Sequence, residues 1–387
     1  MRQNPVKQHI LVGLLAISGS VRGDDQKAEI RTDLVLERFA ISSKGDALVV
    51  PVRVAEKTYD FIVDTGATTT IFDTAIPLGQ PVGVPVAHAA EGKVEVKAYD
   101  PPEAKVGRTS LRSLDVVGGM DLDRIRQVTG LPIRGILGMD FLGSHILHID
   151  IDKGQLLLLK SVPIDAGVEL PISWEPGEMA FVGGEIAPGE PIRFAVDTGA
   201  ISWDSGTLGI HETASLLREG RFREIGKVLT ESLGGTRTRS LIQGGTLSIG
   251  GFTVRSPIFN ESYGRTPNVL GLGFWTRFAA TFDFPGRKVY LRKSARFDRP
   301  DRWNATGLHL VRRGDSIVVE AVDADSPASR AGLKPGDLVE ELDGRNAQEA
   351  GLFELRSTLC DGRPLTCVVR REGRDQRLSL GQADHGH

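Results

Sequence analysis

The chain has 387 residues, of which 40% are hydrophobic and 25% charged, so its composition is that of a globular protein and not of a disordered one. Its length suggests two or three domains. The 47 basic and 50 acidic residues leave a net charge of −3, which gives no electrostatic reason to expect nucleic acid as a partner. The 46 glycines and the scarcity of aromatic residues favour many short strands joined by tight turns.

The N-terminus has the three-part pattern of an export signal. Arg2 and Lys7 give a positive start, residues 10–17 form a short apolar run, and small residues follow up to Gly23. We therefore expect residues 1–23 to be a signal peptide and the protein to be periplasmic or secreted. The apolar run is too short for a stable transmembrane anchor, and no other stretch reaches that length.

Residues 32–160 have the pattern of a domain made mostly of strands. Ala47–Val54 and Thr58–Val63 are predicted to form a hairpin, and its second strand runs directly into Asp64-Thr65-Gly66-Ala67. The clearest helix of this part is expected over Asp121–Gly130. The unit closes with an Asp-turn-strand segment over residues 148–159.

Residues 165–293 repeat this order at a constant offset. Phe61–Ala67 recurs as Phe194–Ala200, an offset of 197 − 64 = 133 residues, and the same offset carries Ile136–Gly138 onto Val269–Gly271. A second hairpin is expected over residues 179–196, a short helix over 212–217 and a second closing segment over 281–291. Two Asp-Thr-Gly copies that share their offset with another motif indicate an internal duplication. A duplicated binding domain without chemistry is the alternative.

An apolar strand that runs into Asp-Thr-Gly places a carboxylate at a turn, where glycine leaves room for the backbone to bend away. Two such turns that meet at a pseudo-twofold axis would bring Asp64 and Asp197 together, and two carboxylates in contact share one proton. The ionised member can then take a proton from a water, while the protonated member donates to a carbonyl oxygen. The sequence therefore predicts amide hydrolysis without a metal or another cofactor.

The two Asp-Thr-Gly-Ala copies, each followed by an apolar-apolar-Gly motif, resemble the pepsin and retropepsin aspartic peptidases, whose shared-proton pair is well established. The resemblance covers residues 32–293. It implies a mainly β fold, a two-lobed acid-protease-type β-barrel pseudo-dimer with an N-lobe at 32–160 and a C-lobe at 165–293. Because both copies lie on one chain, a monomer can be complete.

The resemblance also assigns roles to individual residues. It implies that Asp64 and Asp197 are catalytic, that Thr65 and Thr198 hold the two turns by reciprocal hydrogen bonds, and that Gly138 and Gly271 lie under the turns. The remaining turn residues are Gly66, Ala67, Gly199 and Ala200. A pepsin-type flap tyrosine is not evident; the flap candidates are Ala90–Ala98 and Ser232–Thr238.

Three other features allow more than one interpretation. Asp204-Ser205-Gly206-Thr207 also resembles a pepsin active-site motif, but the offset places Asp204 opposite Ile71, so Asp197 is preferred. His145 and His148 are the nearest approach to a metal pair, and a structural role is favoured for them. The two cysteines, Cys360 and Cys367, would be either a disulfide or a reduced pair.

After Lys293 the chain changes character. Residues 294–302 are charged and contain Pro300, as expected of a linker. Residues 303–382 resemble a bacterial PDZ domain of α+β type, most clearly over Gly332–Asp337. Helices are predicted over 326–331 and 350–359, strands over 316–322 and 338–342, and a hairpin across residues 372 and 373.

The PDZ resemblance implies a peptide-binding site. Gly307, Leu308, His309 and Leu310 would form the loop that receives a chain-end carboxylate, with His309 where a glycine is usual. A peptide would then add as a strand beside residues 308–311. A packing domain without a ligand is the alternative.

The predicted function is an aspartic endopeptidase that hydrolyses polypeptides, with the PDZ-like domain recruiting substrate or regulating access. A C-terminal peptide is the candidate ligand of that domain. The alternative is a catalytically inactive peptide-binding or scaffold protein that keeps the duplicated lobes. A metal-dependent hydrolase is a weaker third hypothesis.

Overall fold

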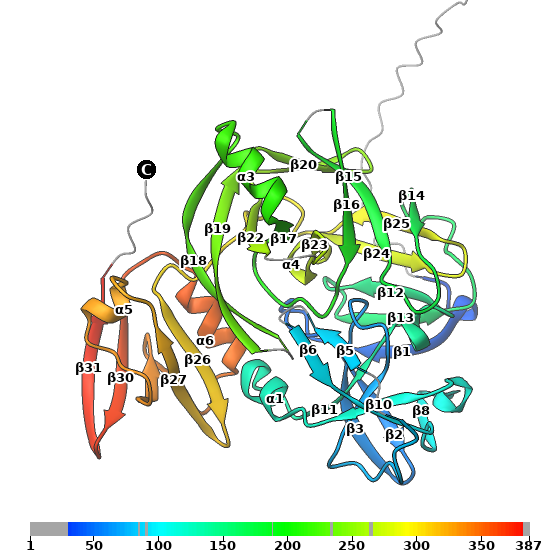
Figure 1. The fold of residues 1–387 in the computed structure, drawn as a ribbon, viewed down its shortest axis with the longest axis horizontal. Helices are drawn as coiled ribbons and strands as arrows, with labels where there is room; N and C mark the ends of the chain where they lie inside the picture. Colours follow the sequence, from blue (N-terminus) through cyan, green and yellow to red (C-terminus); the bar gives the residue numbers. More distant parts are fainter. Residues whose placement is uncertain are drawn as a thin grey trace, which may run out of the picture.

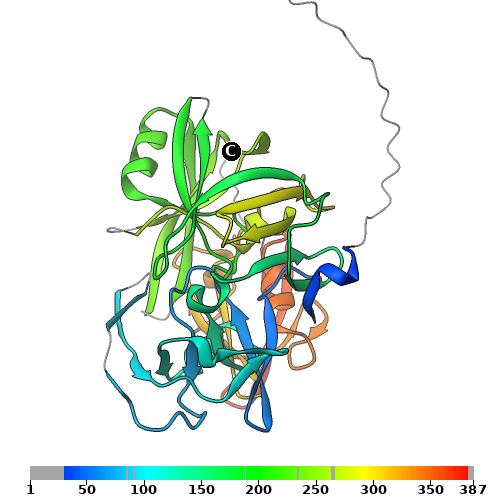
Figure 2. The ribbon, with the colours of Figure 1, turned by 90° about the vertical axis from the view of Figure 1, so that its right-hand side faces the viewer.

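The computed structural model describes residues 30–381, except for residues 84–85, 90–91, 188, 233–234 and 263–265. The signal peptide predicted at residues 1–23 lies outside this part. The chain is mainly β-structure, as predicted, with two lobes and a third domain at the C-terminus (Figures 1 and 2). Within the described residues, no helix has the length and apolar character needed to cross a membrane.

The N-lobe is built on a sheet with the strand order β7-β10-β4-β11-β3-β2-β8-β9. In β2 the alternating sequence buries Val50, Val52 and Val54, as expected for a strand with one face in the core. β11 runs parallel to β3, so both strands end at the same edge, where Asp64 follows β3. The elements are η1 (Thr32–Leu34), β2 (Val49–Val54), β3 (Lys57–Val63), β4 (Ile71–Asp73), β5 (Val86–Ala89), β6 (Gly92–Glu95), β7 (Lys97–Tyr99), β8 (Ala104–Val106), β9 (Thr109–Ser110), η2 (Leu111–Ser113), β10 (Val117–Met120), α1 (Asp123–Thr129), β11 (Ile133–Leu137) and α2 (Met139–Leu142).

The C-lobe has the same local strand pairing around its own aspartate. β16 runs parallel to β23, as β3 runs parallel to β11, and β17 lies antiparallel beside β23, as β4 does beside β11. The elements are β15 (Phe181–Ala187), β16 (Glu190–Val196), β17 (Gly206–Gly209), α3 (Ile210–Arg218), β18 (Phe222–Ser232), β19 (Gly235–Gly244), β20 (Thr246–Ile249), β21 (Phe252–Arg255), β22 (Ile258–Ser262), β23 (Val269–Leu270) and α4 (Leu272–Trp275).

A run of six strands joins the lobes in the order β1-β13-β12-β24-β25-β14. The central pair is β12 with β24, where His148 lies opposite Thr281, and these two positions differ by 281 − 148 = 133 residues. Adding 133 to the bounds of β1, 35 and 40, gives 168 and 173, the bounds of β14. The six strands are β1 (Val35–Ala40), β12 (Ile146–Asp150), β13 (Gln155–Leu159), β14 (Val168–Ser173), β24 (Phe278–Asp283) and β25 (Lys288–Lys293).

One apolar cluster runs through both lobes, from Phe61 and Phe72 in the first to Phe194 and Phe274 in the second. A separate cluster fills the C-terminal domain. The lobes therefore fold around a shared interior, while the C-terminal domain has a core of its own.

The C-terminal domain has a sheet in the order β26-β27-β28-β30-β31. α5 begins where predicted: the Ser326 hydroxyl accepts a hydrogen bond from the Ser329 amide, and Pro327 occupies the first turn. Cys360 and Cys367 are both buried free thiols, so they form no disulfide. The elements are β26 (Leu308–Arg313), β27 (Ser316–Val322), α5 (Pro327–Arg330), β28 (Leu338–Leu342), β29 (Arg345–Asn346), α6 (Leu352–Leu359), β30 (Leu365–Arg371) and β31 (Arg374–Leu380).

The segment 294–302, predicted as a linker, is packed against the C-lobe and is not a free tether. Asp301 forms a buried ion pair with Arg277 at 2.5 Å and accepts hydrogen bonds from the Ser205 hydroxyl and the Ile258 amide. Arg277 also donates to the carbonyls of residues 297 and 299. The charged composition of this segment suggested a solvated linker, but one of its charged residues, Asp301, is buried as the partner of Arg277.

The C-terminal domain is docked on both lobes. α1 of the N-lobe packs against β26, as Figure 1 shows, and Arg124 of α1 forms a two-pronged ion pair with Glu320 at 2.6 and 2.8 Å. On the C-lobe, the Trp203 ring stacks on Phe353 of α6 with centroids 4.8 Å apart. Lys44 forms an ion pair with Glu354 of the same helix.

Candidate active site

The structure brings Asp64 and Asp197 together where the lobes meet. Their carboxyl groups lie within hydrogen-bonding reach of each other. Each aspartate follows an apolar strand, β3 or β16, and its backbone amide donates to the carbonyl of the adjacent strand, Leu137 at 3.0 Å or Leu270 at 3.1 Å. Both side chains are half-buried, so the pair lies deep in the protein yet keeps access to solvent.

Each carboxylate is fixed by its own turn. Oδ1 of Asp64 accepts from the amides of Gly66 at 2.8 Å and Ala67 at 3.1 Å. Oδ1 of Asp197 accepts from the corresponding amides, both at 2.9 Å. One oxygen of each carboxyl group is therefore satisfied by the backbone, which leaves the other for its partner or for a bound water.

Thr65 and Thr198 exchange hydrogen bonds across the interface. The Thr65 hydroxyl donates to the Val196 carbonyl at 2.8 Å and accepts from the Thr198 amide at 3.0 Å. The Thr198 hydroxyl donates to the Val63 carbonyl at 2.8 Å and accepts from the Thr65 amide at 3.1 Å. All of these groups are buried, so each turn depends on the other lobe for its hydrogen bonds.

The glycines of the motif are required because a larger side chain would not fit at their positions. A Cβ atom on Gly66 would lie 2.6 Å from both carboxyl oxygens of Asp197, and one on Gly199 would collide with Asp64. Neither glycine has a positive φ. The third residue of each Asp-Thr-Gly turn is thus a glycine because the opposite carboxyl group occupies the place of its side chain.

Gly138 and Gly271 lie against the backs of the two turns. A Cβ on Gly138 would lie 2.7 Å from the Thr69 carbonyl oxygen, and one on Gly271 would lie 2.8 Å from the Ala200 carbonyl oxygen. The residues that follow them donate to the turns: Met139 to Ala67 and Leu272 to Ala200, both at 2.8 Å.

Burial raises the pKa of both aspartates, since water is partly excluded from their carboxyl groups. The pKa of Asp197 is raised further by the negative charge of Asp64 beside it. The hydrogen bonds from the turn amides oppose these effects because they stabilise the ionised form. The pair consequently retains a proton at pH values where an isolated carboxyl group is ionised.

The sequence did not point to a second polar layer behind the first turn. Asp140 accepts from the Thr70 hydroxyl at 2.6 Å and from the Thr70 amide at 2.8 Å, and the Thr70 hydroxyl also accepts from the Gly138 amide at 3.2 Å. This network connects the turn after Asp64 to α2. Its only sequence signal is that Asp140 follows the Ile-Leu-Gly motif closely.

The alternative motif at Asp204 lies apart from the aspartate pair. Asp204 is buried, accepts from the Ser202 hydroxyl at 2.6 Å, and precedes β17. Burial raises its pKa to about 7. It is therefore a second perturbed carboxyl group, which has the Gly206 amide and the charge of Asp301 near it but is not a member of the Asp64–Asp197 pair.

The flap candidates fall on two hairpins, of which the structure describes only parts. Ala90–Ala98 includes β6 and part of β7, and residues 90–91 lie outside the described residues. Ser232–Thr238 includes the end of β18 and the start of β19, and residues 233–234 lie outside.

His145 and His148 do not lie together as a metal pair. His145 faces the Phe141 carbonyl, while His148 is buried with its Nδ1 2.8 Å from the Thr281 hydroxyl. In the part of the chain that the structure describes, no group of three or more His, Cys, Asp or Glu residues could hold a metal ion.

The predicted peptide-binding residues lie at the start of β26, an edge strand of its sheet. The Leu308 carbonyl accepts from the Asn304 side chain at 2.8 Å, and the Leu310 carbonyl accepts from Arg356 of α6 at 3.0 Å. His309 is bonded to Asp323 at 3.0 Å, and Gly307 has a φ of 67°, a conformation suited to glycine. Two of the carbonyls on this strand therefore already have partners within the protein.

Comparison with known proteins gives two family matches and one relative. Residues 50–144, which contain Asp64 and Gly138, match the gag-polyprotein putative aspartyl protease family, and residues 318–371 match the PDZ domain. The predicted architecture is confirmed. The chain carries an aspartyl protease domain of the gag type and a PDZ domain.

The relative is a Staphylococcus aureus (strain MRSA252) protein described as "Serine protease HtrA-like". It is 28% identical over 100 residues, which are 25% of this chain and 13% of that protein. The chain thus matches only about an eighth of the relative's length. Together, the family matches and this relative indicate a protease-like protein with a PDZ domain.

Proposed function

We propose that the protein is an aspartic endopeptidase in which Asp64 and Asp197 activate one water for attack on a peptide bond. The observation that carries the proposal is the contact between two Asp-Thr-Gly turns whose threonines exchange buried hydrogen bonds. This arrangement holds two carboxyl groups at hydrogen-bonding distance with only one oxygen of each occupied by backbone amides.

The chemistry follows from the shared proton. The ionised carboxyl group accepts a proton from a water between the pair, and the water oxygen attacks the carbonyl carbon of the substrate. The protonated carboxyl group donates to the carbonyl oxygen as its negative charge develops. The resulting intermediate collapses when the leaving nitrogen receives a proton, which releases an amine and a carboxylic acid without a covalent enzyme intermediate.

The name of the staphylococcal relative raises the alternative of a serine peptidase. Among the described residues, no histidine is bonded both to a serine hydroxyl and to a carboxylate: His145 faces Ser144 and a carbonyl, His148 faces Thr281, and His309 faces Asp323. A charge-relay arrangement of the serine type is not assembled there. The aspartate pair is therefore the better-supported reaction centre.

The test is hydrolysis of denatured casein by the full chain, with Asp64→Asn and Asp197→Asn as variants. Each substitution should lower the rate by at least about 100-fold, because it removes one member of the acid-base pair. Asp204→Asn is the matched control: this carboxyl is also buried but lies outside the pair, and its variant should keep most of the activity.

Equal activity in the wild type and in both pair variants would exclude the aspartic mechanism. No activity in any form, with tight binding of the same polypeptide, would favour the non-enzymatic peptide-binding alternative. Insensitivity of the wild-type rate to chelators would exclude a metal-dependent hydrolase.

The pH profile gives an independent test. Because both pKa values are raised, the pair should keep its shared proton from acid conditions towards neutral pH. The kcat/KM should fall on the alkaline side at a higher pH than the ordinary carboxyl pKa of about 4 would give. A profile that rises steadily from pH 6 to pH 9 would contradict the mechanism.

A further inference from the structure

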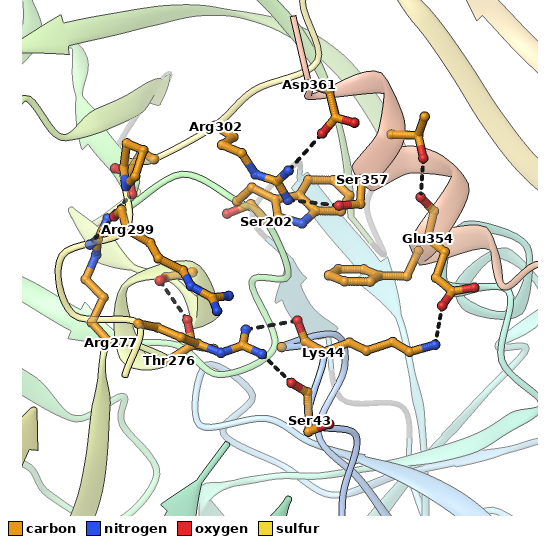
Figure 3. Close-up of a pocket in the computed structure, with 18 of the residues that line it drawn as sticks. Ser43, Lys44, Ser202, Thr276, Arg277, Arg299, Arg302, Glu354, Ser357 and Asp361 are labelled. Carbon is orange, nitrogen blue, oxygen red and sulfur yellow. Dashed lines mark hydrogen bonds and ion pairs between the residues drawn. The ribbon is translucent and has the colours of Figure 1, made fainter. Parts of the chain in front are cut away.

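A cavity of about 660 Å³ lies where the two lobes, segment 294–302 and the PDZ domain meet (Figure 3). Ser43 and Lys44 come from the N-lobe, Trp203 and Thr276 from the C-lobe, and α6 supplies the wall from the PDZ domain. None of the aspartate-pair residues lines it, so this space is distinct from the candidate active site.

The lining carries a marked excess of positive charge. It contains six cationic side chains and three carboxylates, and each carboxylate already has a cationic partner. The ion pairs are Lys44–Glu354, Arg277–Asp301 and Arg302–Asp361, and the cations that remain are Arg296, Arg299 and Arg345.

The remaining arginines have no carboxylate partner within 4 Å among the described residues. Arg296 donates to the carbonyls of Ser43 and Lys44. Burial and the neighbouring charge of Arg299 lower the pKa of Arg296, and the nearby carboxylates of Asp46 and Asp152 oppose this only in part. Positive charge thus gathers along this lining: Arg296 is half-buried, Arg299 and Arg345 are exposed, and Asp343 and Glu354 are the carboxylates near Arg345.

Arg299 and Arg345 make no side-chain hydrogen bond or ion pair with any described residue, although both line the cavity. The N–H donors of both guanidinium groups are therefore available to a ligand in the cavity. A guanidinium fork matches the paired oxygens of phosphate and carboxylate groups, and it is weakly hydrated for a cation.

The other walls suit a polar ligand with a flat part. Ser43, Ser202, Thr276 and Ser357 bring hydroxyl groups to the cavity, and the stacked rings of Trp203 and Phe353 form an apolar wall. Figure 3 shows the ion pairs arranged around the cavity, with Arg302 and Ser357 on one side and Lys44 on the other.

We propose that this interdomain cavity binds a multivalent oxyanion, with Arg299 and Arg345 as its main free donors and the phosphate group as the preferred chemistry. The ligand neutralises the excess charge of the lining and contacts all parts of the chain that meet there. Ser202 and Trp203 lie two and three residues after Ala200, so the ligand also contacts the segment that leaves the second active-site turn.

The proposal is tested on the full chain by isothermal titration with pyrophosphate and, separately, with citrate, at an ionic strength held constant with sodium chloride. Saturable binding of pyrophosphate is expected. The double variant Arg299→Gln/Arg345→Gln should weaken it by roughly tenfold or more, since two charge-assisted contacts are lost. Arg53→Gln, which removes an exposed arginine on β2 away from the cavity, should leave the affinity unchanged.

The double variant should fold normally, because neither side chain has a hydrogen-bond or ion-pair partner among the described residues, and its unliganded melting temperature checks this. Equal binding to wild type and double variant, or no binding above the chloride control, would overturn the proposal. Binding of citrate alone would overturn the choice of phosphate. The titration does not depend on catalysis, so its outcome is independent of the aspartic mechanism.

Discussion

At the scale of single residues, the two Asp-Thr-Gly turns are held by partners from the opposite lobe. The Thr65 hydroxyl makes two buried hydrogen bonds, with groups 131 and 133 residues away, and the Thr198 hydroxyl makes the equivalent pair. A threonine in this position therefore contributes to the association of the lobes as well as to the shape of its own turn.

Thr65→Val should reduce the free energy of unfolding by about 2–6 kcal/mol. It removes one hydroxyl and leaves a buried amide and a buried carbonyl without partners, each at a cost of about 1–3 kcal/mol. Urea denaturation measures the loss. Thr65→Ser is the control, because it keeps the hydroxyl; if serine destabilises as much as valine, the hydrogen bonds are not the cause.

His148 makes stability depend on pH. Burial lowers its pKa from 6.5 to about 3, so the imidazole is neutral in the folded protein. Below pH 6.5 the unfolded chain binds a proton that the folded protein does not, and folding stability falls by about 1.4 kcal/mol per pH unit until the folded pKa is reached.

His148→Gln should make the loss of stability between pH 6.5 and pH 4 less steep than in the wild type. Urea denaturation at a series of pH values measures both slopes. An unchanged slope in the variant would show that other groups cause the acid sensitivity. Above pH 6.5 the histidine makes no contribution of this kind, so any difference there reflects packing.

The residues of the two turns were predictable from the sequence because their chemistry is local and occurs twice. The polar pairs that surround the turns could not be predicted from the sequence in the same way. Thr70 and Asp140 are 70 residues apart, and Arg277 pairs with Asp301 through a segment whose charged composition suggested a linker. Such pairs depend on tertiary contacts that have no periodic signal.

At the scale of helices and strands, most elements lie within a few residues of their predicted bounds. The alternating or continuous apolar pattern fixed the strands around both aspartates, and turn residues fixed the hairpins. The docking of α1 on the PDZ domain was not predictable, because a short helix with several charged residues gives no indication of its partner. The second half has no helix at the corresponding position, since 133 added to 123–129 gives 256–262, which is mostly β22.

Gly138 follows β11 and packs against the turn that contains Asp64, so Gly138→Ala tests how closely this contact supports the turn. The new methyl group would lie within 2.9 Å of backbone atoms of Ala67 and Thr69, which cannot move away as a side chain can. Such overpacking typically costs about 1–3 kcal/mol, and here it also displaces the turn of Asp64. Both urea stability and the rate of casein hydrolysis should fall.

Gly183→Ala is the matched control for that change. Gly183 lies in β15 and has no atom within 4 Å of the position of the new methyl group. It should leave stability and activity close to those of the wild type. A Gly138→Ala variant that behaves like this control would show that the first turn tolerates displacement.

At the scale of the whole molecule, side chains of α6 join the PDZ domain to the protease lobes. Arg356 donates to the Leu310 carbonyl of β26 and to the Val128 carbonyl of α1, at 3.0 and 2.8 Å. A peptide that adds to β26 would have to displace Arg356 from the first of these carbonyls.

Arg356→Gln should therefore strengthen the binding of a labelled peptide with a free apolar C-terminus. The shorter side chain leaves the edge of β26 open and removes the contact with α1. Fluorescence anisotropy measures the affinity, with Arg330→Gln, on α5, as the control. Weaker binding in Arg356→Gln would indicate that the arginine itself contacts the peptide.

The burial of segment 294–302 has a practical consequence for anyone who wishes to exchange or remove the PDZ domain. A chain cut after Lys293 would keep the guanidinium of Arg277 in the interior and lose Asp301, its one carboxylate partner among the described residues, at a cost of about 3–5 kcal/mol. A hybrid protein with a foreign C-terminal domain should for this reason retain residues up to Arg302 and be joined after that point. The natural seam between the two modules lies on the far side of Asp301, not at the end of the last protease strand.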